Sequence, residues 1–193
     1  MSAGSVGACV EDYTESVLSS IPDDFDGFIL DVPVGTGVLT SQKYARLTKA
    51  TILALDYSQG MLQQARKRHG QLGIRNVTLV RGDIGHLPIG DSTVDLCVSM
   101  NGLHAFPKKE LALAEIHRVL KPEGKFIGCF YVTGKGRLTD FLVGTLLSRS
   151  GCFTEPFFSE SGAVSLLEEG FRINSTGNKR SIFYFEASNR RHD

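Results

Sequence analysis

The sequence predicts an α/β protein in which a mainly parallel β-sheet is covered by helices on both faces. Segments of strand length alternate with segments of helical composition from residue 28 to residue 132. The strand segments are apolar at successive positions, which is typical of strands buried on both faces. The last two strand segments are separated by a short turn, so the sheet should end in an antiparallel hairpin.

The predicted elements follow one another in a simple order. A short helix at 10–20 precedes a strand at 28–32, a helix at 36–49, a strand at 51–55 and a helix from Ser58 to Gly70. Strands at 77–80 and 94–100 come next, then a helix that Pro107 opens and a strand at 125–132. An amphipathic helix around 138–146, a helix at 161–169 and strands at 171–175 and 181–187 complete the chain, with residues 176–179 as the hairpin turn.

The composition favours one globular domain over residues 1–193. Hydrophobic residues make up 41% of the chain and charged residues 22%, and 21 basic side chains balance 21 acidic ones. This balance argues against a nucleic-acid partner, and no apolar stretch is long enough to span a membrane. The four cysteines lack metal-ligand spacing, so we expect free thiols, no metal and a reduced, cytoplasmic protein.

A glycine turn follows the first strand and organises the predicted site. Asp31 ends the apolar segment, Pro33 breaks it, and Gly35 and Gly37 flank Thr36. Glycines at such a turn adopt positive φ and let a ligand approach the backbone. The helix expected after the turn would present unpaired N–H groups, so the stretch predicts a nucleotide site.

Acidic residues end the first three predicted strands. In an open parallel sheet the ligand binds beyond the carboxyl ends of the strands, where Asp31, Asp56 and Asp83 are expected. No lysine or arginine accompanies them, which favours a neutral or cationic ligand over a phosphate-rich one. Asp56 could accept hydrogen bonds from ribose hydroxyls or cap the turn at Ser58. Thr40 stands where a dinucleotide fold has its third glycine, and no phosphate-binding loop motif is present.

Four motifs in order make the chain similar to class I S-adenosylmethionine-dependent methyltransferases, particularly the small-molecule group with the ubiquinone and menaquinone enzymes. The motifs are DVPVGTG at 31–37, LDYSQGML at 55–62, RGDIGHLPIGDSTVD at 81–95 and EIHRVLKPEG at 115–124. The resemblance spans residues 10–187 and implies a Rossmann-like seven-stranded sheet. Its strand order would be 3-2-1-4-5-7-6, with the seventh strand antiparallel.

The resemblance also implies the cofactor, S-adenosylmethionine, with S-adenosylhomocysteine as product. Asp31 would interact with the amino group of its methionine part, Asp56 with the ribose, and Asp83 and the Ile84 N–H with adenine. The complete set of implied cofactor residues is Asp31, Pro33, Gly35, Thr36, Gly37, Asp56, Tyr57, Met61, Asp83, Ile84, Met100 and Asn101. Pro33 departs from the family, which usually has glycine there; proline is acceptable if that position needs no positive φ.

Methyl transfer is an in-line displacement that needs alignment and a dry site. His104, just past the fourth strand, is the candidate base or substrate-binding residue; a loop-orienting role is the alternative. Residues 133–158 form an insertion that we expect to act as a lid over a small acceptor of apolar or aromatic character, methylated at O, N or C. A non-catalytic cofactor-binding module and an aminopropyltransferase-like relative are the other functions considered. The sequence leaves the oligomeric state open.

Overall fold

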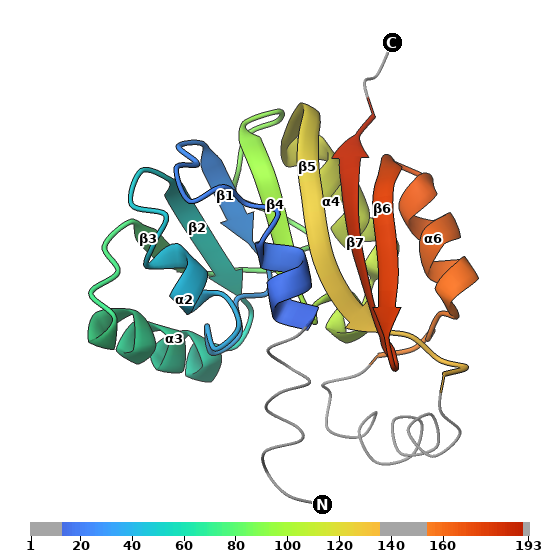
Figure 1. The fold of residues 1–193 in the computed structure, drawn as a ribbon, viewed down its shortest axis with the longest axis horizontal. Coiled ribbons are helices and arrows are strands. Elements are labelled where there is room, and N and C mark those ends of the chain that lie inside the picture. Colours follow the sequence, from blue (N-terminus) through green and yellow to red (C-terminus); the bar gives the residue numbers. More distant parts are fainter. Residues whose placement is uncertain (1–12, 136–153, 191–193) are drawn as a thin grey trace, which may run out of the picture.

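A seven-stranded sheet forms the centre of the molecule (Figure 1). The computed structural model describes residues 13–135 and 154–190. The strand order is β3-β2-β1-β4-β5-β7-β6, and β7 runs antiparallel to both β5 and β6, as the sequence predicted. The strands are β1 (Phe28–Asp31), β2 (Thr51–Asp56), β3 (Val77–Arg81), β4 (Val94–Met100), β5 (Leu120–Tyr131), β6 (Phe171–Lys179) and β7 (Ile182–Asn189).

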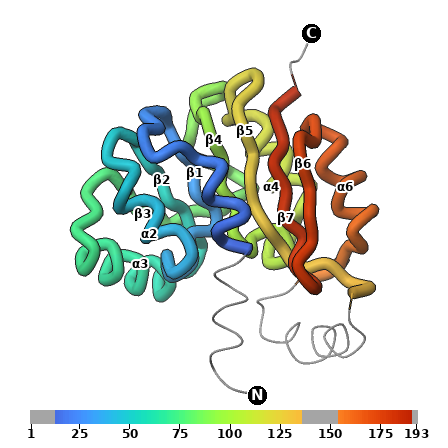
Figure 2. The backbone as a smooth tube through the Cα atoms, viewed as in Figure 1, coloured from blue at the N-terminus to red at the C-terminus, as the bar shows by residue number. Residues whose placement is uncertain are grey.

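Helices cover both faces of this sheet. The helices are α2 (Ser41–Tyr44), α3 (Gln59–Gln71), α4 (Lys109–Val119) and α6 (Glu160–Glu168), with a 3₁₀ turn η1 at Leu103–Ala105. Residues 13–18 are also helical. The tube in Figure 2 shows α4 and α6 behind the sheet, and α2 and α3 on its near side.

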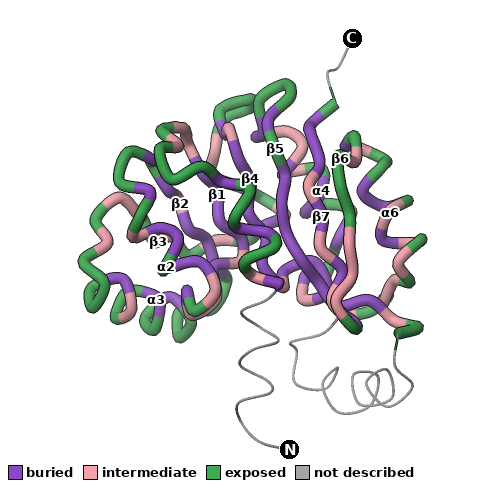
Figure 3. Tube along the Cα trace, in the orientation of Figure 1, coloured by how far each residue is buried: buried purple, intermediate pink, exposed green. Residues whose placement is uncertain are grey.

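Residues that alternate along each strand supply two separate cores. Ile29 packs in the cluster that includes the helix at 13–18, whereas its neighbour Leu30 packs in the cluster that includes α4 and α6. Phe126 and Ile127 of β5 divide between the same two clusters. The central strands are therefore buried on both faces (Figure 3). This explains why they read as continuous apolar segments.

The helix predicted over residues 36–49 is wrong in length, because only Ser41–Tyr44 is α-helical. The hydroxyls at its start bind elsewhere: Ser41 Oγ donates to the Gly37 carbonyl and Thr40 Oγ1 donates to Asp31. Further along, Asn76 Nδ2 donates to the carbonyls of Leu47 and Ala50, at 2.7 and 3.1 Å. The chain therefore forms turns after Tyr44, and the helix does not continue. Hydroxyl and amide side chains compete for the backbone groups that a helix would use.

The hairpin is present, but its turn lies later than predicted. Residues 176–179 belong to β6, and Lys179 pairs with Ile182. The turn therefore consists of Arg180 and Ser181, with Arg180 at a φ of 54°. This turn contains no glycine, so the sequence placed the predicted turn at Gly177, a few residues too early.

The predicted insertion lies mostly outside the described residues, which stop at 135 and resume at 154. Both of its ends are hydrogen bonded. The Thr133 N–H donates to the Phe158 carbonyl at 2.9 Å, and the Thr154 N–H donates to the His104 carbonyl at 2.8 Å. The expected helix around 138–146 and the lid role of 133–158 stay predictions. Over the described ranges, none of the helices has the length and apolar character to cross a membrane.

Candidate cofactor and acceptor site

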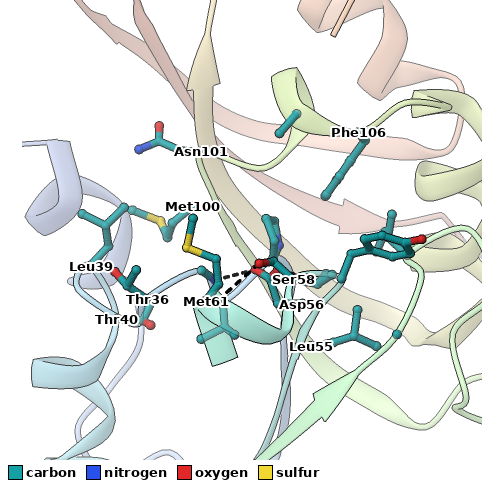
Figure 4. A pocket seen from close by; sticks show the side chains of 18 of the residues that line it. Thr36, Leu39, Thr40, Leu55, Asp56, Ser58, Met61, Met100, Asn101 and Phe106 are labelled. Carbon is teal, nitrogen blue, oxygen red and sulfur yellow. Dashed lines mark hydrogen bonds between the residues drawn. The ribbon is translucent and has the colours of Figure 1, made fainter. Parts of the chain in front are cut away.

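A pocket of about 780 Å³ lies at the carboxyl ends of β1, β2, β3 and β4. The sequence-predicted residues that line it are Pro33, Gly35, Thr36, Asp56, Tyr57, Met61, Asp83, Ile84, Met100, Asn101 and His104. In the view of Figure 4, Asp56 and Ser58 lie near the centre, with Met100 and Thr36 on one side and Phe106 on the other. Asp31 and Gly37 are absent from the lining and lie beneath it.

The two glycines of the turn have different surroundings. Both have positive φ, 56° at Gly35 and 70° at Gly37. A Cβ at Gly35 would meet nothing within 4 Å, so there is open space beside the backbone at this point of the pocket wall. A Cβ at Gly37 would lie 2.8 Å from Ser41 Oγ and 3.2 Å from His69 Nε2. Gly37 is therefore needed for packing against the neighbouring helices, and Gly35 leaves room for a ligand.

Pro33 fits the turn without a positive φ. The peptide bond between Val32 and Pro33 is cis. Its ring packs closely on Gly102 after β4, because a Cβ added at Gly102 would lie only 2.5 Å from Pro33 Cδ. A glycine at 102 thus accommodates the proline that departs from the family pattern.

Asp56 joins the first two strand ends. Its Oδ2 accepts the Gly35 N–H at 2.8 Å and its Oδ1 accepts the Ser58 N–H at 2.8 Å. Ser58 in turn caps α3 by accepting the Met61 N–H at 3.3 Å. The turn-capping role considered for Asp56 is therefore real, and it coexists with a place in the pocket wall. Each carboxylate oxygen carries a second lone pair that remains suited to a hydroxyl donor.

Asp31 is fully buried below the glycine turn. Thr40 Oγ1 donates to its Oδ2 at 3.0 Å, while Oδ1 makes no hydrogen bond within the described part of the chain. Burial raises the pKa of Asp31 to about 7, although the hydroxyls of Tyr44 and Thr40 oppose the shift. Asp31 therefore supports the glycine turn from below and does not itself reach the pocket surface.

The third strand end supplies Asp83 and Ile84. Asp83 Oδ1 accepts the Gly85 N–H at 2.9 Å in a turn, which leaves Oδ2 as the atom for a ligand. Ile84 is buried, whereas Tyr57, which also lines the pocket, is 72% exposed. Arg81 lies 5.9 Å from the centre of the Tyr57 ring. An exposed aromatic ring at a pocket rim suits stacking on a flat ligand.

The end of β4 is tied to the helix at 13–18. Asn101 has a φ of 58°, and its Nδ2 donates to the Tyr13 hydroxyl at 3.3 Å. Its Oδ1 is 3.7 Å from Cys129 Sγ. Asn101 is thus held in the left-handed region by contacts to two elements, which fixes the chain where β4 enters η1.

His104 is a buried, neutral histidine at the edge of the pocket. Its Nδ1 accepts the Tyr131 N–H at 3.1 Å, so in the neutral ring the proton is on Nε2. Burial, with a smaller contribution from the Lys109 cation, lowers the pKa of His104 to about 4. A ring in this state can donate a hydrogen bond, but it is poorly suited to accept a proton.

Sequence reasoning missed Lys109, which is 1% exposed. Its Nζ donates to the Thr154 carbonyl at 2.7 Å, to Thr154 Oγ1 at 3.0 Å and to the Phe106 carbonyl at 3.2 Å. Lys109 therefore fixes the loop that carries His104 to the chain at Thr154. One signal was present: a cation in the first turn of a helix opposes the helix dipole and requires another reason. No cluster of metal-ligating side chains occurs among the residues that the structure covers.

Comparisons with known proteins agree with this geometry. A family described as "Methyltransferase domain" matches residues 29–124. A demethylmenaquinone methyltransferase of Thermobifida fusca is 35% identical over 120 residues, covering 62% of this chain and 50% of that protein. A solved S-adenosylmethionine-dependent methyltransferase of Aquifex aeolicus superposes with a TM-score of 0.72 at 21% identity, covering 91% of this chain and 88% of that one. The [4+2]-cyclase SpnF has the same fold, with a TM-score of 0.78 at 18% identity over 94% of this chain and 81% of its own.

Residues 29–124 match the methyltransferase family, and the chain has the fold of the class I S-adenosylmethionine-dependent methyltransferases. Within that class it is similar to the demethylmenaquinone enzymes, although it spans only half the length of the Thermobifida relative. The cofactor of the class is S-adenosylmethionine, and its product is S-adenosylhomocysteine. The open space beside Gly35 fits the close approach of the amino acid part of that cofactor.

Proposed function

We propose that this chain transfers the methyl group of S-adenosylmethionine to a small-molecule acceptor. The observation that carries the proposal is the pocket at the carboxyl ends of β1 to β4, which Gly35, Asp56 and Asp83 all line. These residues come from three separate strand ends, and each fits one part of the cofactor. When bound, S-adenosylmethionine supplies an electrophilic methyl group on a sulfonium.

We assign the cofactor contacts as the sequence predicted them. The turn at Gly35, Thr36 and Gly37 would hold the methionine part, with Asp31 below it. Asp56 would bind the ribose hydroxyls, and Tyr57 and Met61 would flank the ribose and adenine. Asp83 would accept from the adenine amino group while the Ile84 N–H meets the ring. Pro33, Met100 and Asn101 would line the methyl side.

His104 has a substrate-holding role in this proposal. Its Nδ1 is occupied by the Tyr131 N–H and its pKa is far below neutrality, so the ring is a donor at neutral pH. An acceptor whose nucleophile loses its proton late, or is already ionised, needs no protein base. Of the two roles that the sequence suggested, binding is therefore better supported than proton removal.

The acceptor in this proposal is apolar or aromatic, and a quinol is the leading candidate. Beside His104, the pocket wall consists of Ala105, Phe106 and Pro107. This wall is apolar and has no carboxylate to hold a polycationic acceptor such as an aminopropyltransferase uses. The named activity of the Thermobifida relative, demethylmenaquinone methylation, points to the same class of acceptor.

Two measurements test the proposal. S-adenosylmethionine and S-adenosylhomocysteine should each raise the melting temperature, since a ligand at about 100 times its Kd adds roughly 2.7 kcal/mol of stability. NAD should have no effect. Labelled methyl from S-adenosylmethionine should then appear in one of a panel of quinols and phenols. Binding of the cofactor without transfer to any acceptor would support the alternative, a cofactor-binding module.

A further inference from the structure

The segment between β3 and β4 carries two of the residues assigned to adenine, yet it has no regular structure of its own. Residues 82–93 form turns and bends, and Asp83 and Ile84 in this segment line the pocket. A ligand contact on an irregular loop is accurate only when other elements hold the loop in place. Contacts to α4 hold the middle of this loop.

Glu115 and Arg118 on α4 form a two-pronged ion pair beside the loop. Arg118 Nε lies 2.6 Å from Glu115 Oε1, and Nη2 lies 2.8 Å from Oε2. The same two groups bracket one residue of the loop: Glu115 Oε2 accepts the Leu87 N–H at 2.7 Å, and Arg118 Nη2 donates to the Leu87 carbonyl at 3.2 Å. Both backbone groups of Leu87 are therefore paired with α4.

Arg118 reaches further along the same loop. Its Nη1 donates to the Ile89 carbonyl at 2.9 Å and to Asp91 Oδ1 at 2.6 Å. The hydrogen bonds to Glu115 and Asp91 raise the pKa of Arg118, and the Arg118 hydrogen bond together with the Leu87 N–H lowers the pKa of Glu115. The side chains are only 32% and 19% exposed, so water screens this pair less than a surface ion pair.

A short turn connects the bracketed residue to the pocket. The His86 N–H donates to the Asp83 carbonyl at 3.0 Å, and the Gly85 N–H donates to Asp83 Oδ1 at 2.9 Å. Residues 83–86 thus form one hydrogen-bonded unit that continues directly into Leu87. The orientation of the Asp83 carboxylate follows from where Leu87 is held.

The ends of the loop are fixed without this ion pair. The Gly82 N–H donates to the Asp56 carbonyl at 3.1 Å, and the Thr93 N–H donates to the Val119 carbonyl at 2.9 Å. The sheet therefore does not need the Glu115–Arg118 pair to connect β3 with β4. The pair acts on the middle of the loop, where it controls the approach to Asp83.

We infer that Glu115 and Arg118 are positioning residues that hold the adenine-binding loop at Leu87 and so determine both the affinity and the adenine selectivity of the cofactor pocket. The inference rests on the proposed function, because it takes Asp83 and Ile84 as the adenine contacts. Neither residue lines the pocket. Each acts through the backbone of the loop.

The test measures binding of S-adenosylhomocysteine and of its inosine analogue, in which a carbonyl oxygen replaces the adenine amino group. The variants are Glu115→Gln and Arg118→Lys. We expect Glu115→Gln to weaken S-adenosylhomocysteine binding about tenfold, since a charge-assisted contact to a pre-organised loop is lost. The preference for adenine over the inosine analogue should fall as well, and a general loss of stability would not change that preference.

A matched control is available in the ion pair between Glu123 and Arg172, which are 2.8 Å apart and lie away from the pocket. Glu123→Gln should leave both affinities unchanged. The inference would be overturned if Glu115→Gln and Arg118→Lys had the same affinity for S-adenosylhomocysteine, and the same preference for adenine over the inosine analogue, as Glu123→Gln. If Glu115→Gln does not fold, Asp91→Asn, which removes only one of the Arg118 contacts, should give a smaller shift in the same direction, and an unshifted selectivity would again overturn it. Failure of the wild-type protein to bind S-adenosylhomocysteine would instead refute the cofactor assignment itself.

Discussion

The two halves of the pocket carry different kinds of side chain, acidic in one half and neutral in the other. At the ends of β1, β2 and β3, the polar groups are backbone N–H donors and the carboxylates of Asp31, Asp56 and Asp83. Past the end of β4, they are the Asn101 amide and the neutral His104 ring, next to the apolar wall of Ala105, Phe106 and Pro107. The first half suits a cationic cofactor, and the second suits an apolar acceptor. Burial also acts in opposite directions, since it raises the pKa of Asp31 and lowers that of His104.

The largest effect is expected from the cofactor half. Asp56→Asn should weaken binding of S-adenosylhomocysteine about 100-fold, because the charged acceptor of the ribose hydroxyls is lost and the Gly35 turn loses a charged partner. Isothermal titration calorimetry measures the change. Lys109→Met, which loosens the loop beside the acceptor half, should leave this affinity within about twofold. Equal losses in the two variants would remove the distinction between the halves.

Asp31 should make the free energy of unfolding fall as the pH rises. Its folded pKa of about 7 lies above the unfolded value, so the folded state holds the proton more tightly and loses stability as pH rises between the two values. Relative to Asp31→Asn, the wild-type protein should lose about 2.5 kcal/mol of unfolding free energy between pH 5 and pH 8. Urea unfolding at the two pH values measures it. A constant difference between the two proteins would show that Asp31 is ionised throughout.

His104 should give the opposite dependence. Its folded pKa of about 4 lies below the unfolded value, so the stability that the neutral ring provides is present at high pH and is lost as pH falls from about 6.5 toward 4. Relative to His104→Gln, the wild-type protein should lose about 2 kcal/mol between pH 7 and pH 5. The same unfolding measurement applies. A gain in place of a loss would mean that the folded ring is charged.

The smallest effect concerns turnover. His104→Ala should lower turnover with the identified acceptor about tenfold, since one hydrogen bond to the acceptor or its loop is lost. The affinity for S-adenosylhomocysteine should stay within about twofold. The wild-type rate should show no ionisation of His104 between pH 6 and pH 8. A collapse of cofactor affinity with turnover per bound cofactor intact would contradict this assignment.

The same contrast explains what the sequence could predict. The cofactor half is marked by short local patterns, the glycine turn after Asp31 and the Ser58 cap after Asp56, so local spacing was enough to locate it even though Asp56 bonds to Gly35 across 21 residues. The strand order came from the family resemblance and the antiparallel last strand from the short hairpin turn, and both are confirmed. The helix over 36–49 failed because Ser41 and Thr40 bind other groups, which periodicity does not register.

The acceptor half depends on contacts between distant residues. His104 meets Tyr131, and Lys109 meets Thr154, at separations of 27 and 45 residues. Nothing in the local sequence tells a buried lysine at a helix start from an exposed one. The Glu115–Arg118 pair is an intermediate case. The sequence identified the motif that contains both residues as the segment leading into β5. Their hydrogen bonds to the Leu87 backbone are visible only in the structure.

The two hydrogen-bonded ends of the insertion have a consequence for the entropy of the chain. Thr133 is joined to Phe158, and Thr154 to His104, so the chain leaves and returns to the same end of the sheet through contacts that do not involve residues 136–153. The entropy of closing such a loop grows only with the logarithm of its length. The hydrogen bonds at Thr133 and Thr154 therefore keep both described ends beside the sheet with little dependence on how many residues connect them.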